Sequence, residues 1–166
     1  IKHALEDNDV LVTSGGAWTG DRDLMARALD DLGWEKSYHR VRLGPGKAVG
    51  FGLLNGKPVF ILPGGPPSNL VAFLQVVLPA LKKLCGHSDI FLPQVQAYLD
   101  RTVEGQSDWT QVIFGCLKRK NGKTVFSPTE NISRLKNIAA AEAMLLIPEG
   151  ITVLVKDAMV SVQLMK

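Results

Sequence analysis

The chain has 166 residues, of which 46% are hydrophobic and 21% are charged, a composition typical of a globular protein. Its formal net charge of +3 permits an anionic ligand but is too small for the dense basic surface of a nucleic-acid-binding protein. No apolar run approaches the roughly 20 residues that a membrane-spanning helix requires, and no signal peptide is recognisable. These features predict a cytoplasmic protein.

The first half of the chain alternates predicted helices and strands. A short helix over Lys2–Glu6 precedes an apolar strand, Val10–Thr13, whose lack of polar alternation favours a central parallel strand covered on both faces. Because little sequence precedes this strand, we expect residues upstream of Ile1 to complete its sheet. The pattern then predicts a helix, a strand, a hairpin and a long helix interrupted by Pro79. These elements are Leu24–Leu32, Tyr38–Leu43, Val49–Leu54 with Pro58–Leu62, and Asn69–Cys85.

The second half has a different pattern, and the boundary between two domains is expected near Gly86. Short runs rich in β-branched residues are separated by turn signals, and the basic cluster around Asn121-Gly122 is expected to be a solvated hairpin turn. Six such runs predict a small all-β barrel or sandwich. The runs are Val95–Asp100, Gln111–Leu117, Lys123–Ser127, Met144–Ile147, Thr152–Val155 and Val160–Leu164. The predicted domains are therefore residues 1–86 and 87–166.

Two glycine-rich loops lie where a predicted strand passes into a predicted helix. The first contains Ser14, Gly15 and Gly16, and the second runs from Pro63 to Ser68. A helix start offers unpaired N–H groups and the positive end of the helix dipole, and glycine lets the backbone approach a ligand closely. Both loops are therefore candidate phosphate-binding loops. Neither matches the P-loop or the dinucleotide-binding pattern, so each alone could equally be a structural turn.

Three residues near these loops each have two interpretations. Asp23 could cap the helix that follows it or contribute to a cation site, and the residues alone favour the cap. Lys47 ends a Pro-Gly-Lys turn and could meet an anion or simply be part of the turn. Trp18 could stack on a heterocycle or cover the edge of the sheet, and covering the sheet is favoured.

The chain resembles the molybdopterin molybdenumtransferase (MoeA) family in three ordered motifs, DVLVTSGGAWTGDRD, LGPGKAVGFG and GKPVFILPGGPPSNLVAF. The usual forms in that family are D-x-x-x-x-S-G-G-x-S-x-G-x-x-D, K-P-G-K-P and L-P-G-N-P-x-S. The segment from Asn131 to Gly150 is similar to the small β domain of the same family, so the resemblance covers nearly the whole chain. The chain departs from the motifs at Trp18, Gly44, Ala48 and Gly65, and Gly44 replaces a lysine.

The resemblance implies an α/β fold, with a three-layer molybdopterin-binding domain built on a mainly parallel sheet and followed by a small all-β, barrel-like domain. It implies an enzyme of molybdenum cofactor biosynthesis that inserts molybdenum from molybdate into adenylylated molybdopterin and releases AMP. Mg²⁺ would assist, the protein would be a homodimer, and this chain alone would be inactive. Two alternatives stay open: an adenylyltransferase-type molybdopterin-binding domain, and a non-catalytic molybdopterin-binding or scaffold module.

The functional positions of the family fall on nine residues of this chain. Asp23 and Lys47 would be catalytic, and Asp23 would also bind the metal ion, which reverses the interpretation favoured by the residues alone. The remaining residues would contact the pterin nucleotide: Ser14, Gly15, Gly16, Arg40, Gly64, Pro66 and Ser68. The resemblance implies neither a nucleic acid nor a membrane as partner.

Overall fold

A computed structural model describes residues 1–17, 24–129 and 134–165. The chain divides into two compact units, one formed by residues 1–41 and 46–85 and the other by residues 42–45 and 86–166. The four residues 42–45 thus leave the first unit and belong to the second. No helix among the described residues is both long and apolar enough to span a membrane.

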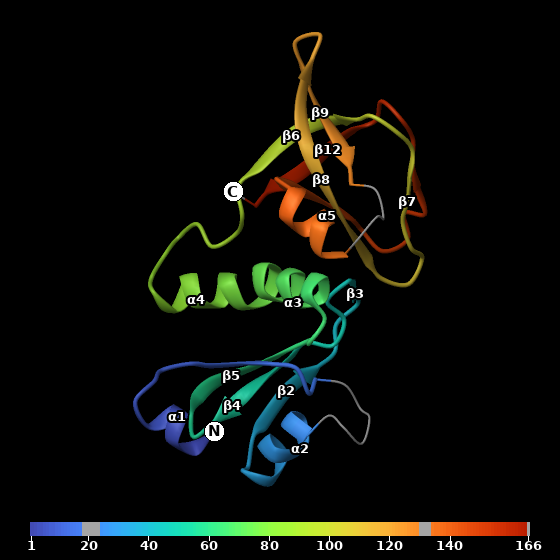
Figure 1. Cartoon of the computed structure of the whole chain (residues 1–166). Helices are drawn as coiled ribbons and strands as arrows, with labels where there is room; N and C mark the ends of the chain where they lie inside the picture. The colour runs from blue at the N-terminus through green and yellow to red at the C-terminus, as the bar shows by residue number, and fades with distance from the viewer. Residues whose placement is uncertain (18–23, 130–133, 166) are drawn as a thin grey trace. The chain divides into compact units, whose positions relative to one another are not determined.

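The first unit is built around a four-stranded sheet in the order β1-β5-β4-β2 (Figure 1). Its strands are β1 (Leu11–Ser14), β2 (Glu35–His39), β4 (Gly50–Leu54) and β5 (Lys57–Leu62). Its helical segments are α1 (Lys2–Glu6), α2 (Leu24–Asp31), α3 (Pro66–Ala72), the π-helix η1 (Phe73–Val77) and α4 (Leu78–Leu84). The expected helices and the hairpin are present, but the strand expected at Tyr38–Leu43 is corrected: β2 ends at His39, Arg40 has a φ of 86° that interrupts an extended strand, and Leu43 belongs to a separate short strand.

The sheet is mixed, so the expectation of a mainly parallel sheet is wrong for the described strands. Only the β1–β5 pair is parallel, whereas β5–β4 and β4–β2 are antiparallel. The cause is local: Asn55 and Gly56 form a two-residue turn with φ of 54° and 74°, and such a turn joins antiparallel strands. β1 is an outermost strand among the described strands, not the central strand that was expected. Its residue Val12 is 39% exposed and so is not covered on both faces.

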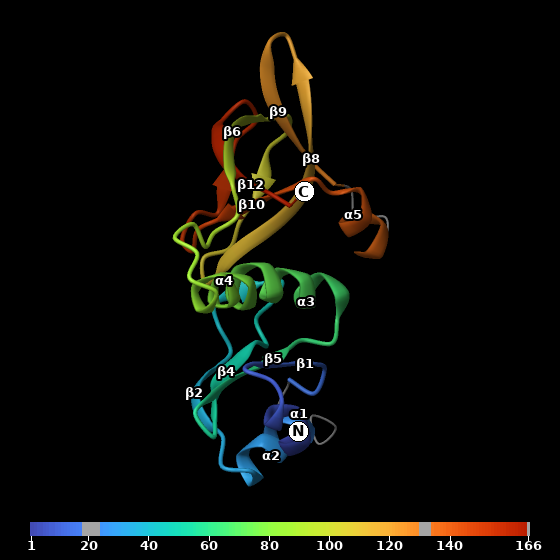
Figure 2. The same cartoon turned by 90° about the vertical axis from the view of Figure 1, so that its left-hand side faces the viewer.

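Helices contact both faces of this sheet, as the alternation along β5 shows (Figure 2). Val59 and Ile61 pack in one cluster with Leu5 of α1 and Leu29 of α2. The residues between them point the opposite way, and Phe60 and Leu62 pack with Ala72 of α3 and Val77 of η1. This period-two alternation is what a strand buried on both faces requires.

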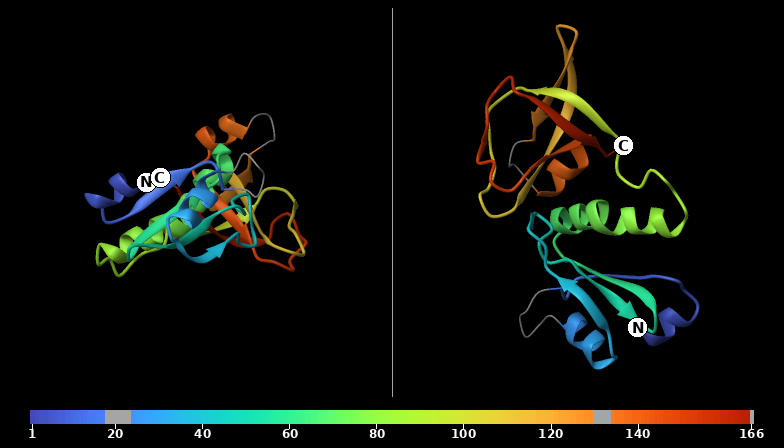
Figure 3. Two further views of the ribbon diagram at one scale, coloured as in Figure 1. Left: turned by 90° about the horizontal axis from the view of Figure 1, so that it is seen from below. Right: turned by 180° about the vertical axis from the view of Figure 1, so that it is seen from behind.

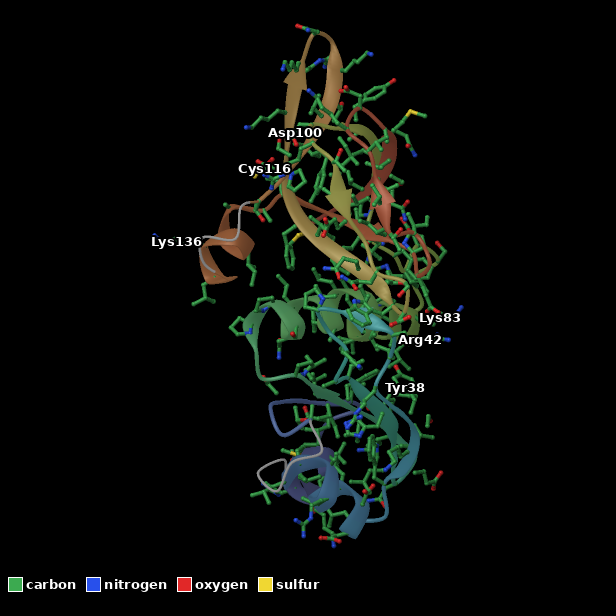
Figure 4. All side chains as sticks on the ribbon, turned by 90° about the vertical axis from the view of Figure 1, so that its right-hand side faces the viewer. Tyr38, Arg42, Lys83, Asp100, Cys116 and Lys136 are labelled. Carbon is green, nitrogen blue, oxygen red and sulfur yellow. The ribbon has the colours of Figure 1, made fainter. Side chains whose placement is uncertain are left out.

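Tyr38 of β2 lies on the same side of the sheet as Phe60 and is labelled in Figure 4. Its ring centroid is 5.8 Å from that of Phe51, which in turn stacks 4.8 Å from Phe60. Burial among these rings raises the pKa of the Tyr38 hydroxyl above its ordinary value. The tyrosine therefore remains neutral at physiological pH.

The long helix begins three residues earlier than expected, at Pro66. Pro66 and Pro67 occupy its first turn, where a missing N–H leaves no intrahelical bond unmade. α3, η1 and α4 then follow without a break to Leu84. The predicted interruption at Pro79 takes the form of a π turn, in which the N–H of Leu78 donates to the carbonyl of Phe73. A π turn is one way for a helix to accommodate a residue that cannot donate.

The second unit is a barrel-like sheet, as expected. Five strands close a ring in the order β10-β12-β6-β9-β8 and back to β10 (Figure 3, right). They are β6 (Gln94–Leu99), β8 (Thr110–Lys120), β9 (Lys123–Pro128), β10 (Ala143–Ile147) and β12 (Met159–Leu164). The predicted hairpin turn at Asn121-Gly122 joins β8 to β9. Phe126, Leu145 and Val162 are buried inside the ring.

The second unit also contains elements that the sequence pattern did not predict. A seven-residue helix, α5 (Arg134–Ala140), corrects the all-β expectation, and its leucine, lysine and alanines are good helix formers. The other additions are short: β3 (Leu43–Gly44) pairs with β8, and β7 (Val103–Glu104) pairs with the predicted β11 (Val153–Leu154). Strands of two residues are too short to leave a periodic signal in the sequence.

Candidate functional site

The candidate site residues of the first unit lie together at the carboxyl ends of β1, β5 and β2, called here the carboxyl edge of the sheet. β1 runs parallel to β5, and β2 is related to β5 by two antiparallel steps, so all three strands point the same way. Their last residues, Ser14, Leu62 and His39, therefore lie at the same edge. Arg40 follows β2 directly, and Lys47 lies just before antiparallel β4, which begins at this edge. In open α/β sheets, ligands bind outside the carboxyl ends of the strands.

The two glycine loops are immediate neighbours at this edge. The N–H of Gly15 donates to the carbonyl of Leu62 over 2.9 Å, which extends the β1–β5 pairing beyond Ser14. A Cβ atom built on Gly64 would lie 3.5 Å from the Cα of Gly15, an ordinary contact distance. Ser14 and Gly64 are both exposed. The loops therefore form one continuous surface of backbone and hydroxyl groups that a ligand can reach.

The other predicted residues of the second loop lie at the start of α3. Pro66 is its first residue and is exposed, and Ser68 lies in its first turn and is partly exposed. Pro66 and Pro67 have no N–H, and the N–H of Asn69 donates to the carbonyl of Gly65, so the groups that this helix start offers an anion are the N–H and hydroxyl of Ser68. The structure thus brings Gly64, Pro66 and Ser68 to the same edge as the first loop.

Asn69 was not predicted as a site residue, yet it joins the two loops. Its amide nitrogen lies 2.9 Å from Ser14 Oγ in the first loop and 2.9 Å from the carbonyl of Pro63 in the second. The sequence signal was weak: one amide residue directly after the last loop residue, Ser68. The partner is 55 residues away in the chain, so no local pattern could have indicated it.

The need for glycine at position 16 is steric as well as conformational. Gly16 has a φ of 65°, and a Cβ atom there would lie 2.9 Å from Met25 Cβ and 3.1 Å from the backbone nitrogen of Met25. The loop backbone therefore packs directly against the first turn of α2. Gly15 also has positive φ, 88°, but a Cβ atom there would meet nothing within 4 Å. The paired glycines thus have different structural causes.

His39 is a second residue of this edge that the sequence analysis did not single out. Its Nε2 lies 2.6 Å from the carbonyl oxygen of Ala17. A carbonyl can only accept, so Nε2 carries the hydrogen. This bond connects Ala17, the residue after Gly16, to the last residue of β2. The first loop is therefore held at both of its ends, by Asn69 and by His39.

Arg40 and Lys47 are the cations of this edge, and both are exposed. The N–H of Arg40 donates to the carbonyl of Val49, and that of Val41 donates to the carbonyl of Lys47. Arg40 has a φ of 86°, a left-handed conformation that arginine rarely adopts. Arg40 follows β2, which is two strands from β5 and three from β1, so Arg40 lies about 10–15 Å from the glycine loops. Lys47 precedes β4, which is one strand from β5 and two from β1, so Lys47 lies about 5–10 Å from them. An extended ligand with anionic groups at both ends fits this spacing.

Gly44, where the resembled family has lysine, packs against an aromatic ring within the second unit. A Cβ atom on Gly44 would lie 2.6 Å from Trp109 Nε1 and 2.8 Å from its Cδ1. The indole nitrogen donates to Gln111 Oε1 over 3.2 Å, and Arg42 forms an ion pair with Glu149 over 2.6 Å (Figure 4). The space that a side chain at position 44 would need is therefore filled by Trp109.

Restoring the lysine of the family should consequently destabilise the second unit. We expect Gly44→Lys to lower its free energy of unfolding by about 1–3 kcal/mol, because the new side chain must displace the indole. In a Trp109→Ala background the indole is already absent, so Gly44→Lys should cost less stability there than in the wild-type protein. Urea denaturation of the four proteins measures the coupling. Strict additivity of the two substitutions would show that Trp109 does not exclude the lysine.

Asp23 and Trp18 lie outside the described residues, so the proposed roles of both stay predictions. Within the described parts of the chain, no three His, Cys, Asp or Glu side chains lie together as a metal-binding group. A hollow of about 320 Å³ lies elsewhere, beside α1 and Lys57. Because Lys57 begins β5, this hollow is at the sheet edge opposite the glycine loops.

Comparison with known proteins agrees with this geometry. A protein-family model described as "Probable molybdopterin binding domain" matches residues 1–83. The chain is 27% identical over 152 residues to a molybdopterin molybdenumtransferase of Staphylococcus aureus, covering 90% of this chain and 36% of the relative. It is also 27% identical over 150 residues to molybdopterin molybdenumtransferase 2 of Mycobacterium tuberculosis, covering 87% of this chain and 37% of the relative.

Solved structures extend the similarity to both units. A molybdopterin biosynthesis MoeA protein from Pyrococcus horikoshii has a TM-score of 0.82 and 30% identity, covering 99% of this chain and 39% of that one. A second MoeA structure from the same organism has a TM-score of 0.71 at 22% identity and supports the fold alone. This chain spans little more than a third of the length of these relatives. It belongs to the family of molybdopterin-binding domains, and its resemblance to MoeA proteins is confirmed.

Proposed function

We propose that this chain is the part of a molybdopterin molybdenumtransferase that binds adenylylated molybdopterin and positions it for insertion of molybdenum from molybdate. The observation that carries the proposal is the convergence of both glycine loops with Arg40 and Lys47 at one sheet edge. Molybdenum cofactor biosynthesis is the process in which the named relatives take part.

Each group at the edge has a chemical task in this proposal. Backbone N–H groups of the loops and the hydroxyls of Ser14 and Ser68 would bind phosphate oxygens of the pterin nucleotide. Arg40 and Lys47 would bind anionic oxygens through charge-assisted hydrogen bonds, which are stronger than neutral ones. The leaving AMP and the incoming molybdate both carry negative charge, so fixed cations would stabilise the charge during exchange. Lys47 would act there as a catalytic group.

The metal requirement and the assembly are proposed from the family motifs. Asp23 occupies the position of the functional aspartate and would bind Mg²⁺, which polarises phosphate oxygens when bound. The two units would correspond to a three-layer molybdopterin-binding domain and a β domain, predicted as residues 1–86 and 87–166. A homodimer would complete the site. Because the chain spans little more than a third of its relatives, turnover would require further segments of such a protein.

One observation favours a second candidate, a non-catalytic molybdopterin-binding module. The lysine expected at position 44 is absent, and Trp109 fills the space that its side chain would need. Such a protein would bind the pterin nucleotide but would not promote metal insertion. Measuring AMP release in the full-length protein, beside binding, separates the two candidates.

Neutral replacements of the two cations test the anion site. Arg40→Asn and Lys47→Gln should each weaken binding of adenylylated molybdopterin by about 1.5–3 kcal/mol, roughly tenfold or more. Asparagine tolerates positive φ better than arginine does, so Arg40→Asn should not lower thermal stability. A loss of binding without a loss of stability therefore isolates the charge. Isothermal titration and thermal unfolding give the two readouts.

A matched control is Lys83→Gln, which makes the same charge change on α4 (Figure 4). Lys83 is exposed and follows Pro66 by 17 residues of helical chain, about 25 Å from the loops. It should leave affinity unchanged. If Arg40→Asn and Lys47→Gln are as silent as the control, the assigned anion site is wrong. If all three weaken binding equally, only net charge matters.

A further inference from the structure

The hydrogen bonds of Asn69 determine whether the Ser14 hydroxyl of the first glycine loop donates or accepts. Its Nδ2 lies 2.9 Å from the carbonyl oxygen of Pro63 and 2.9 Å from Ser14 Oγ. The carbonyl fixes the orientation of the amide, because it can accept a hydrogen bond but cannot donate one. The amide NH₂ group therefore faces both partners, with one hydrogen for each.

This arrangement assigns a direction to the Ser14 hydroxyl. A serine hydroxyl has one hydrogen and two acceptor lone pairs, and here one lone pair accepts from Asn69. Its own hydrogen must then point away from Asn69. Ser14 is exposed at the carboxyl end of β1, so that hydrogen is available to a ligand at the surface where both loops meet. The hydroxyl is prepared to donate, which suits a ligand oxygen that can only accept.

The same amide also fixes the spacing of the loops. Pro63 begins the second loop and is buried, whereas Ser14 is the last residue of β1 and the first of the first loop. Asn69 is half-buried in the first turn of α3, so its side chain is held by the helix that the second loop initiates. One residue therefore couples the helix start, the second loop and the hydroxyl of the first loop.

We propose that Asn69 is a positioning residue that orients the Ser14 hydroxyl as a donor toward an unprotonated phosphate oxygen of the ligand. The inference rests on the proposed function and deepens it by naming the ligand group that this hydroxyl binds. It assigns no contact between Asn69 and the ligand. Asn69 acts through Ser14.

Two replacements of Asn69 by residues of similar size separate its hydrogen-bonding role from its packing. In Asn69→Asp the side chain keeps its shape but can only accept, so it captures the Ser14 hydrogen and withdraws it from the ligand. Its negative charge also repels an anion, so the same substitution in a Ser14→Ala background measures the charge effect alone. Asn69→Leu removes the bond but leaves the Ser14 hydrogen free to rotate. Affinity for adenylylated molybdopterin, measured by isothermal titration of the full chain, should fall at least tenfold in Asn69→Asp and by a smaller factor in Asn69→Leu.

A double-mutant cycle measures whether the effect of Asn69 on affinity depends on the Ser14 hydroxyl, which a purely structural role of Asn69 would not require. In a Ser14→Ala background there is no hydroxyl to orient, so Asn69→Leu should cause no further loss of affinity. Thermal unfolding of each variant monitors the fold, and Lys83→Gln serves as the remote control. If Asn69→Asp does not fold, the Asn69→Leu and Ser14→Ala cycle alone decides the matter.

The outcomes distinguish this inference from the function on which it rests. If the wild-type chain does not bind adenylylated molybdopterin, the proposed function fails, and the ligand assigned to Ser14 fails with it. If wild type binds and Asn69→Asp retains its affinity, the proposed function stands and the role of Asn69 is overturned. Equal losses from Asn69→Leu with and without Ser14 also overturn it. Loss in Asn69→Asp together with a silent Asn69→Leu in the Ser14→Ala background supports it.

Discussion

Gly16→Val is expected to lower the free energy of unfolding of the first unit by about 2–5 kcal/mol. Two penalties combine: a β-branched residue is strained at a φ of 65°, and its Cβ would lie 2.9 Å from Met25 Cβ. The substitution should push the first loop away from the start of α2, so binding of the pterin nucleotide should weaken as well. Urea denaturation measures the stability, and isothermal titration measures the affinity.

Gly15→Val is the matched control for this prediction. Gly15 has a φ of 88°, but a Cβ atom there has no neighbour within 4 Å, so only backbone strain of about 1–2 kcal/mol is expected. The difference between the two variants isolates the contact with α2. Equal destabilisation by both would show that close packing on Met25 is not the reason for glycine at position 16.

Phe126→Ala should cost the second unit about 3–5 kcal/mol of free energy of unfolding. The side chain is fully buried inside the strand ring, and its ring packs directly over Gly115 of the neighbouring β8. Its removal leaves a cavity among Leu99, Leu145 and Val162. Hydrogen exchange should show lost protection in β6, β9, β10 and β12, whose residues surround the cavity.

Phe91→Ala provides the comparison within the same unit. Phe91 is 59% exposed, so its truncation should change stability by no more than about 0.5 kcal/mol. A small effect of Phe126→Ala, similar to that of Phe91→Ala, would contradict the closed ring with Phe126 at its centre. The two variants remove the same atoms, which leaves burial as the difference between them.

The elements that the sequence predicts well are those with a local signal. The apolar spacing in Leu24–Asp31 and the turn at Asn121-Gly122 each need only a few neighbouring residues, and both are found in the structure. Six of the strands in the second unit were predicted for the same reason. The mixed sheet could also have been expected, because the predicted hairpin over Val49–Leu62 already required an antiparallel pair.

The parts that escaped prediction depend on pairing between distant residues. Asn69 meets Ser14 across 55 residues, and His39 meets Ala17 across 22. A single sequence contains no sign of either contact, since Asn69 is an ordinary polar residue beside a predicted loop and His39 lies within a predicted strand. The exclusion of a side chain at Gly44 likewise depends on Trp109, which lies far along the chain. The motif resemblance located the loops but not the residues that hold them.

The central claim is that the carboxyl edge of the first unit binds a phosphorylated pterin. Isothermal titration of the folded chain with molybdopterin, beside molybdopterin from which the phosphate has been removed, tests it most directly. The account predicts saturable binding of the phosphorylated form and at least roughly tenfold weaker binding of the other, because the loops bind phosphate oxygens. Equal affinity for the two forms, or no binding of either by the folded chain, would contradict it.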